Sequence, residues 1–196
     1  MTKPEMRASM LGVLRGIGSA DLAARSLRIA RRLAETDAWS RADLVLCFLS
    51  MPREVDTSGI VSAARAGGKG VAAPRIEGRT IRFLMLPPEA GAPPRDRWGI
   101  PEPDPAWTEA DLARGGGVLV VVPGLAFDRA CNRVGRGKGF YDGFLREARG
   151  LAGERLSAIG VCVREQLVAE VPRDAHDQML DGVVTEVETI LAPRDT

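Results

Sequence analysis

Apolar residues recur at helical spacing in the first part of the chain. Two such segments, residues 4–18 and 20–38, are separated by a short turn around Gly16 and Gly18. In the second segment the apolar positions recur at intervals of three and four residues, with arginines between them, as on the buried face of an amphipathic helix. We therefore predict two N-terminal helices and interpret the arginines of the second as a solvated face.

Continuous apolar runs of strand length follow at residues 43–49, 118–122 and 156–163. Such runs are typical of strands covered on both faces of a sheet, whereas a strand with one face in water alternates between apolar and polar residues. We predict buried strands at all three positions. Weaker signals predict further strands at residues 69–73 (ended by Pro74), 79–86, 165–171 and 182–187, with a hairpin over residues 75–86.

Helices are predicted after two of these strands. One spans residues 57–66 and stops at Gly67 and Gly68, and the other spans residues 140–148. Strands that alternate with helices, without an internal repeat, indicate a three-layer α/β fold with a largely parallel sheet flanked by helices. We predict a single domain over residues 1–196, a length that suits one well-buried core.

A proline-rich segment interrupts the predicted sheet. Residues 87–105 hold seven of the thirteen prolines. We interpret this segment as a long ordered excursion rather than a linker, because the strands on both sides of it need each other. Trp98 lies within it. We expect its side chain either to hold the loop in place by packing or to form one face of a ligand pocket.

Composition narrows the class of protein. Hydrophobic residues make up 45% and charged residues 27% of the chain, which is ordinary for a globular protein. The net charge of +1 implies no global attraction to polyanions, and 5% aromatic residues are too few for a base-stacking platform. We therefore expect small-molecule partners and no nucleic acid. We also expect a monomer.

The N-terminus and the cysteines bear on the location of the protein. Charged residues interrupt the N-terminal segment, which argues against a signal peptide or a membrane span. The three widely spaced cysteines form no metal-binding pair and suggest reduced thiols. We expect a cytoplasmic protein.

One stretch, residues 123–139, combines positive charge with glycine, and we call it the cation loop. Alternating glycines let a backbone pass through positive φ and approach a ligand closely. Successive N–H groups in such a turn form an anion site beside the positive end of the following helix. We predict that this loop binds phosphate. Its positively charged residues are Arg129, Arg133, Arg136 and Lys138, and its last glycines are Gly135, Gly137 and Gly139.

The spacing excludes two familiar phosphate motifs. Gly137 and Lys138 are followed by Gly139 rather than by Ser or Thr, so the loop is not a Walker A motif. Counted from Gly135, a dinucleotide fingerprint would need a third glycine where Phe140 stands. The cation loop is therefore a phosphate site of another kind.

Three carboxylates are candidates for the same site. Glu54 and the cation loop each follow a predicted strand, and ligands of such sheets lie beyond the carboxyl ends of the strands, so the two loops can converge. Asp142 either stabilises the first turn of a helix or holds Mg²⁺ beside a bound phosphate. Asp177 lies in a late loop, where it is either a turn residue or a functional one.

No nucleophilic catalytic set is evident. His176 is the only histidine and is interpreted as an exposed loop residue, while Cys131 is interpreted as a packed loop residue. Charge stabilisation without an evident nucleophile suits phosphoryl transfer, where positioning and electrostatics do most of the catalysis.

The motifs as a whole resemble one known family, 5-formyltetrahydrofolate cyclo-ligase. The central motif is Pro123-Gly-Leu-Ala-Phe-Asp128 followed by Asn132-Arg-Val-Gly-Arg-Gly-Lys-Gly-Phe-Tyr-Asp142. It is long and specific. Supporting matches are Leu49-Ser-Met-Pro-Arg-Glu-Val-Asp-Thr57, Trp98-Gly-Ile-Pro-Glu-Pro103, Val171-Pro-Arg-Asp-Ala-His-Asp177, Val184-Thr-Glu186 and the pair Lys3 and Arg7.

The resemblance implies a fold related to the ribose-phosphate isomerase and CoA-transferase group, with ATP as co-substrate and Mg²⁺ as cofactor. It also implies a mechanism. The γ-phosphoryl group passes to the formyl oxygen of 5-formyltetrahydrofolate, nitrogen 10 attacks the activated carbon, and phosphate leaves to give 5,10-methenyltetrahydrofolate and ADP.

The resemblance further implies roles for particular residues. It implies catalytic charge stabilisation by Arg133, Arg136 and Lys138, and Mg²⁺ ligation by Asp142 and Asp177. The implied ATP contacts are Lys3, Arg7, Arg133, Gly135, Arg136, Gly137, Lys138, Gly139, Phe140 and Tyr141. The implied folate contacts are Leu49, Glu54, Trp98, Arg136, Gly137, Lys138, Gly139 and Phe140.

Two alternatives remain open at the level of the sequence. One is a folate- or nucleotide-binding protein of the same fold that binds without turnover, although two candidate metal carboxylates favour an enzyme. The other is a relative of the CoA-transferases or sugar-phosphate isomerases, for which only Glu54 could serve as a catalytic carboxylate.

Overall fold

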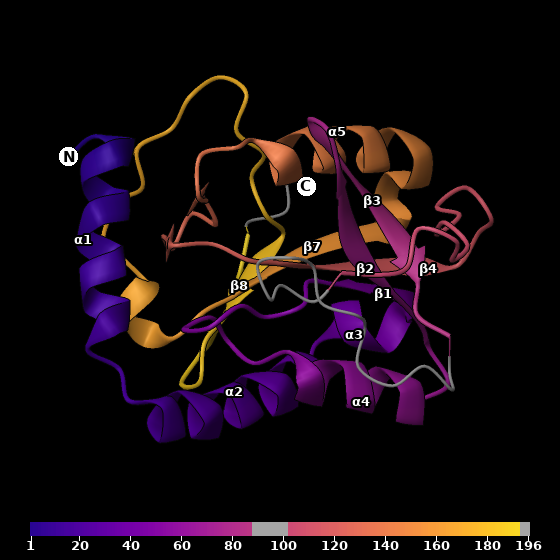
Figure 1. The fold of residues 1–196 in the computed structure, drawn as a ribbon, viewed down its shortest axis with the longest axis horizontal. Helices are drawn as coiled ribbons and strands as arrows, with labels where there is room; N and C mark the ends of the chain where they lie inside the picture. Colours follow the sequence, from indigo (N-terminus) through magenta and orange to yellow (C-terminus); the bar gives the residue numbers. More distant parts are fainter. Residues whose placement is uncertain (88–101, 193–196) are drawn as a thin grey trace.

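The computed structural model describes residues 1–87 and 102–192 (Figure 1). Its centre is a seven-stranded sheet with the order β3-β2-β1-β4-β7-β8-β9. The strands are β1 (Ala42–Cys47), β2 (Gly70–Glu77), β3 (Thr80–Met85), β4 (Gly117–Val122), β7 (Leu156–Val161), β8 (Gly182–Val184) and β9 (Thr189–Leu191). The segment after β4 adds a short hairpin of β5 (Ala126–Phe127) and β6 (Arg133–Val134).

The five central strands, β2-β1-β4-β7-β8, run parallel, and β3 and β9 pair antiparallel at the two edges. Helices connect β1 to β2 and β4 to β7 and cover the sheet, so the predicted three-layer α/β fold with a largely parallel sheet is confirmed. The carboxyl ends of β1, β4, β7 and β8 lie at one edge of the sheet, which is where ligands of such folds bind.

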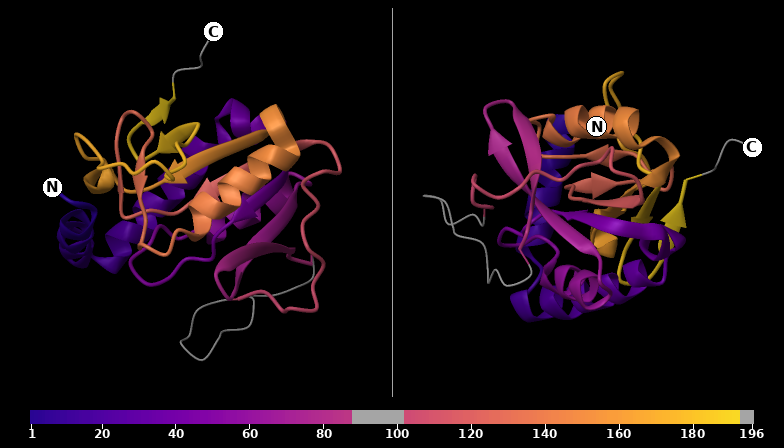
Figure 2. Two further views of the ribbon diagram at one scale, coloured as in Figure 1. Left: turned by 90° about the horizontal axis from the view of Figure 1, so that it is seen from above. Right: turned by 90° about the vertical axis from the view of Figure 1, so that its right-hand side faces the viewer.

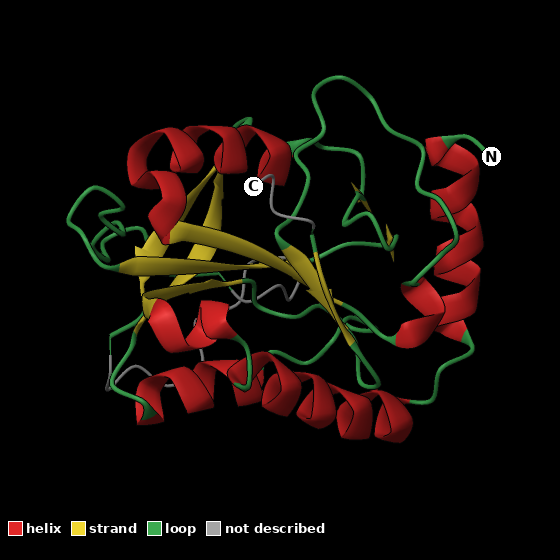
Figure 3. Cartoon of the chain, turned by 180° about the vertical axis from the view of Figure 1, so that it is seen from behind, coloured by secondary structure: helices red, strands yellow, loops and turns green. Residues whose placement is uncertain are grey.

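Helices form the outer layers (Figures 1 and 3). The helices α2 and α4 pack against each other on one face, while α5 lies on the other face (Figure 3). The helix α1 stands beside one end of the sheet (Figures 1 and 2), where it contacts β5 and β6. The helices are α1 (Lys3–Arg15), α2 (Ser19–Ala34), α3 (Asp37–Arg41), α4 (Ser58–Ala66) and α5 (Phe140–Ala152).

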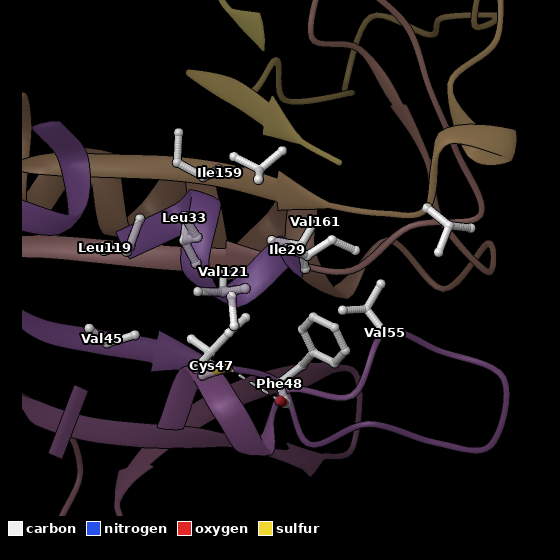
Figure 4. Close-up of a cluster of buried hydrophobic side chains, with 14 of the residues drawn as sticks. Ile29, Leu33, Val45, Cys47, Phe48, Val55, Leu119, Val121, Ile159 and Val161 are labelled. Carbon is white, nitrogen blue, oxygen red and sulfur yellow. Dashed lines mark hydrogen bonds between the residues drawn. The ribbon is translucent and has the colours of Figure 1, made fainter. Parts of the chain in front are cut away.

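The continuous apolar runs of the strands are explained by a core on each face. Side chains alternate between the two faces of a strand, and in β4 Leu119 and Val121 join the cluster under α2 while Val120 and Val122 join the cluster under α5. Figure 4 shows the first cluster, in which Ile29 and Leu33 of α2 meet residues from β1, β4 and β7. Burial on both faces is what the sequence predicted for these strands.

Pro74 does not end its strand, contrary to the sequence prediction. The strand β2 continues to Glu77 and forms the predicted hairpin with β3, in which Pro74 lies opposite Phe83. The pairing of β2 with β1 ends at Ala72, so Pro74 lies where β2 has only one neighbour. A proline that lacks an N–H group is tolerated there, because no bond to β1 is lost.

Several short elements differ from the prediction. Residues 165–171 are not a strand, because a 3₁₀ helix (Arg164–Gln166) begins there. The helix α1 ends at Arg15, and α5 extends to Ala152. The elements that were not predicted are α3, β5, β6 and β9. Trp98 lies outside the described residues. Within residues 1–87 and 102–192, no helix is both long and apolar enough to cross a membrane.

Candidate functional site

The first half of the cation loop is a buried hairpin built around Asp128. The carboxylate of this buried residue accepts hydrogen bonds from the backbone N–H groups of Ala130 (3.0 Å) and Asn132 (2.9 Å) and from the Asn132 side chain. It also accepts the N–H of Val171 (3.0 Å), which starts the loop that carries Asp177. One carboxylate therefore links two segments of the site. Sequence reasoning missed this role, although an aspartate in a loop often accepts the backbone N–H two residues on, as Asp128 does from Ala130.

Cys131 lies in the same turn and does not serve as a nucleophile. Its thiol is buried, and its backbone has φ of 62°. Burial, together with the carboxylates of Asp128 and Asp181, raises the pKa of Cys131 to about 11. The thiol is therefore protonated at neutral pH, as expected for a packed loop residue.

Arg133 is the buried cation of the site. Its side chain is only 5% exposed, and its Nη2 donates to Asp142 Oδ1 at 2.9 Å. Its guanidinium also lies 5.8 Å from the centre of the Tyr141 ring. A Cβ atom at Gly135 would lie 2.7 Å from Nη1 of Arg133, so a side chain there would force the guanidinium of Arg133 to shift.

The second half of the cation loop is exposed. Gly137 and Gly139 have φ of 94° and 70°, a backbone conformation that favours glycine. Arg136 and Lys138 alternate with them and are exposed, and Lys138 makes no hydrogen bond or ion pair with any residue the structure describes. Gly139 is also the N-cap of α5, so the positive end of that helix faces the same loop.

The helix α1 brings two N-terminal cations to the site. Arg7 Nε donates to the carbonyl oxygen of Gly135 at 2.9 Å, and Lys3 Nζ contacts Asp174 and Asp177 at 2.7 Å each. The helix begins with a capping box between Thr2 and Glu5, which satisfies free N–H groups at its start. The structure therefore places Arg7 beside the cation loop and Lys3 beside the loop that carries Asp177, although both are far from these loops in the sequence.

Asp142 and Asp177 lie on the same side of the molecule. Asp142 Oδ1 accepts the backbone N–H of Gln178 at 3.2 Å, so the Asp142 carboxylate touches the residue that follows Asp177. Partial burial opposes ionisation of Asp177, but its hydrogen bonds from Lys3 and from the backbone of Asp174 hold its pKa below the ordinary value. Lys3 pairs with the Asp177 carboxylate, as Arg133 pairs with Asp142, so each carboxylate has a protein cation beside it.

This pair of carboxylates suits a magnesium ion that arrives with a nucleotide. The described residues contain no group of three or more His, Cys, Asp or Glu side chains that could hold a metal, so they form no all-protein metal site. Mg²⁺ commonly takes one or two carboxylates together with phosphate oxygens and water. Asp142 and Asp177 fit that donor set.

Glu54 and Arg136 join the two loops at the sheet edge. Glu54 Oε1 accepts from Nη2 of Arg136 at 2.9 Å and from its Nε at 3.2 Å. The other oxygen of Glu54 accepts the N–H of Met51 at 3.1 Å. The expected convergence of the two loops is confirmed.

The remaining candidate residues are partly packed into the protein. Leu49 packs against the core under α2, and Phe140 packs against the core under α5. The Tyr141 hydroxyl is buried without a hydrogen-bond partner among the described residues, and burial raises its pKa. His176 is exposed, as expected.

Two cavities lie away from the cation loop. One of about 430 Å³ is lined by Lys69, Met85 and Trp107, among others. The other, of about 1590 Å³, is lined by residues at the start of β4 and β7, such as Gly117 and Leu156. The larger cavity therefore lies at the amino ends of the parallel strands, opposite the site described above.

Comparison with known proteins gives the family. Residues 1–186 match the model of the 5-formyltetrahydrofolate cyclo-ligase family. The chain belongs to this family. A curated relative from Schizosaccharomyces pombe, named a probable 5-formyltetrahydrofolate cyclo-ligase, is 28% identical, and the alignment covers 97% of this chain and 98% of the relative. A second, from Mus musculus, is named 5-formyltetrahydrofolate cyclo-ligase. It is 29% identical, and the alignment covers 94% of this chain and 93% of the relative.

A solved structure supports the fold of this cyclo-ligase family member. The NMR structure of 5,10-methenyltetrahydrofolate synthetase from Aquifex aeolicus has a TM-score of 0.82 and 23% identity, covering 100% of this chain and 95% of that one. At this identity the similarity concerns the fold. The resemblance drawn from the motifs, and with it the prediction of an enzyme of this family, is confirmed.

Proposed function

We propose that this member of the family catalyses the ATP- and Mg²⁺-dependent cyclisation of 5-formyltetrahydrofolate to 5,10-methenyltetrahydrofolate. The observation that carries the proposal is the grouping of Lys3, Arg7 and the cation loop beside Asp142 and Asp177 at the carboxyl edge of the sheet. Cations for phosphate and carboxylates for a hard metal ion are what phosphoryl transfer from ATP requires.

The chemistry needs an activated formyl oxygen. Transfer of the γ-phosphoryl group to that oxygen makes it a leaving group. Nitrogen 10 attacks the formyl carbon and loses its proton to water, and phosphate departs with the oxygen. ADP and phosphate are the other products. Arg133, Arg136 and Lys138 would stabilise the charge on the transferred group, because fixed cations in a site need no reorganisation during the reaction.

The three cations would act differently. Arg133 is held by Asp142 beneath the loop and would supply a constant positive field. Arg136 and Lys138 are exposed and would contact phosphate oxygens directly. The backbone N–H groups of Gly135, Gly137 and Gly139 and the first turn of α5, with Phe140 and Tyr141, would complete the nucleotide site.

Mg²⁺ bound with the nucleotide would neutralise phosphate charge and orient the transferred group. Asp142 and Asp177 are the residues that would hold it. On the folate side, Glu54 would accept N–H groups of the substrate and Leu49 would contact its ring. Trp98 is proposed to contact the substrate, as the motif resemblance implies. A single domain, a monomeric state and a cytoplasmic location remain predictions.

The proposal is tested with purified protein, 5-formyltetrahydrofolate, MgCl₂ and ATP. We expect the near-ultraviolet absorbance of the methenyl product to rise only when ATP and Mg²⁺ are both present. Binding of both ligands without such a rise would identify a non-catalytic binding protein of the same fold instead.

A further inference from the structure

The ion pair between Glu54 and Arg136 joins two residues that the proposed function assigns to different ligands. The Glu54 carboxylate is 15% exposed and is held by the backbone of its own loop through Met51. The Arg136 side chain is 47% exposed and lies between Gly135 and Gly137. Glu54 is therefore the fixed partner and Arg136 is the one that can move.

The pair is also easy to break. A half-exposed ion pair contributes little to stability, because water screens it and two long side chains must be ordered to form it. The glycines on either side of Arg136 impose few restrictions on the backbone. A ligand of either kind can therefore replace one of the partners at small cost.

We propose that Glu54 is a positioning residue for the nucleotide site, because it holds Arg136 away from phosphate until substrate occupies the Glu54 carboxylate. An amine or ring N–H of the substrate competes with Arg136 for Oε1 of Glu54, and a phosphate oxygen competes with Glu54 for Arg136. Either ligand therefore frees the group that the other needs. By linkage, substrate and nucleotide each raise the affinity for the other by the same factor.

The inference rests on the proposed function, and it makes an unusual prediction for a substrate-binding residue. The variant E54Q should bind nucleotide more tightly than the wild type in the absence of folate, since its neutral amide releases Arg136. From the weakness of such pairs we expect the Kd for Mg²⁺ with a non-hydrolysable ATP analogue to fall about two- to fivefold by titration calorimetry. Binding of 5-formyltetrahydrofolate by E54Q should weaken in the same experiment.

A matched control removes the same charge elsewhere. Glu109 forms an exposed ion pair with Arg82 at 2.6 Å on the β3 hairpin, so E109Q changes the net charge as E54Q does. It should leave the Kd of the analogue unchanged. A gain in E109Q equal to that in E54Q would contradict the inference, because the gain would then come from total charge.

A double-mutant cycle assigns the gain to Arg136. In the R136Q background, E54Q should no longer tighten the analogue, and the coupling between analogue and folate seen in the wild type should fall. If E54Q binds the analogue as the wild type does, or if its gain persists without Arg136, the inference is wrong. In that case the proposed function still stands if the wild type turns over, whereas a wild type that binds no nucleotide would contradict both.

Discussion

The two halves of the cation loop, residues 123–134 (the hairpin half) and residues 135–139 (the glycine half), both carry positive charge but lie in different environments. In the hairpin half, Asp128 and Arg133 are buried; Asp128 accepts hydrogen bonds within the turn, and Arg133 forms an ion pair with Asp142. In the glycine half, Arg136 and Lys138 are exposed on a backbone that only glycine adopts easily. The comparison indicates that the first half sets the shape of the loop, while the second half leaves its cations accessible to the proposed ligand.

The largest effect is expected at the buried cation. R133M should lower the free energy of unfolding by about 3–5 kcal/mol, because it leaves the partly buried Asp142 carboxylate without its partner. Urea denaturation measures this loss. The double variant R133M/D142N should recover part of the stability without recovering activity, and an unaltered stability of R133M would contradict a structural role for the hairpin half.

The next largest effect is expected for K138A, which should impair catalysis and leave stability unchanged. K138A should raise the transition-state free energy by about 2–4 kcal/mol, as expected for the loss of an electrostatic donor, while the denaturation curve stays unchanged. Steady-state kinetics with ATP and folate measure it. Unchanged kinetics would show that Lys138 does not contribute to the site.

A smaller effect should follow from a methyl group on the glycine half. G137A places a Cβ atom at φ of 94° and 3.2 Å from Arg7 Cζ, so it should destabilise the fold by about 1–3 kcal/mol and weaken nucleotide binding. G143A is the matched control, because a Cβ atom there meets nothing within 4 Å and α5 should gain up to about 1 kcal/mol. Equal behaviour of the two variants would mean that the conformation of Gly137 does not matter.

The smallest effect is the pH dependence of the pair between Lys3 and Asp177. The pKa of Asp177 lies below its ordinary value of 3.8, so the stabilisation is present above that pH and is lost as the pH falls through the lower, folded-state value. We expect no more than about 1 kcal/mol for this partly exposed pair. The difference in unfolding free energy between wild type and D177N should shrink between pH 6 and pH 3; a constant difference would contradict the assignment.

The sequence predicted the framework of the fold because parallel strands buried on both faces carry long apolar runs. It also predicted the cation loop, since alternating glycine and charge form a local pattern. The strand through Pro74 was missed because the tolerance for proline depends on where β1 stops pairing. The short elements α3, β5, β6 and β9 are fixed by tertiary contacts, and their own patterns are too short to identify them.

The pairing of charges across the site also lay beyond sequence reasoning. Arg133 and Arg136 have the same side chain and lie three residues apart in one loop, yet one is buried and the other exposed. The contact between Lys3 and Asp177 joins residues 174 positions apart, which no local pattern reveals. The family resemblance implied which residues belong to the site, and the structure adds which cation pairs with which carboxylate.

The central claim is that nucleotide phosphates bind the glycine half of the cation loop at the carboxyl edge of the sheet. The most direct measurement follows backbone amide resonances by NMR while Mg²⁺ and a non-hydrolysable ATP analogue are added. We predict that the amides of Gly135, Gly137 and Gly139 shift, while those of Gly117 and Gly153, which line the large cavity at the opposite edge, do not. Shifts centred on Gly117 and Gly153, with the loop glycines unmoved, would contradict the account.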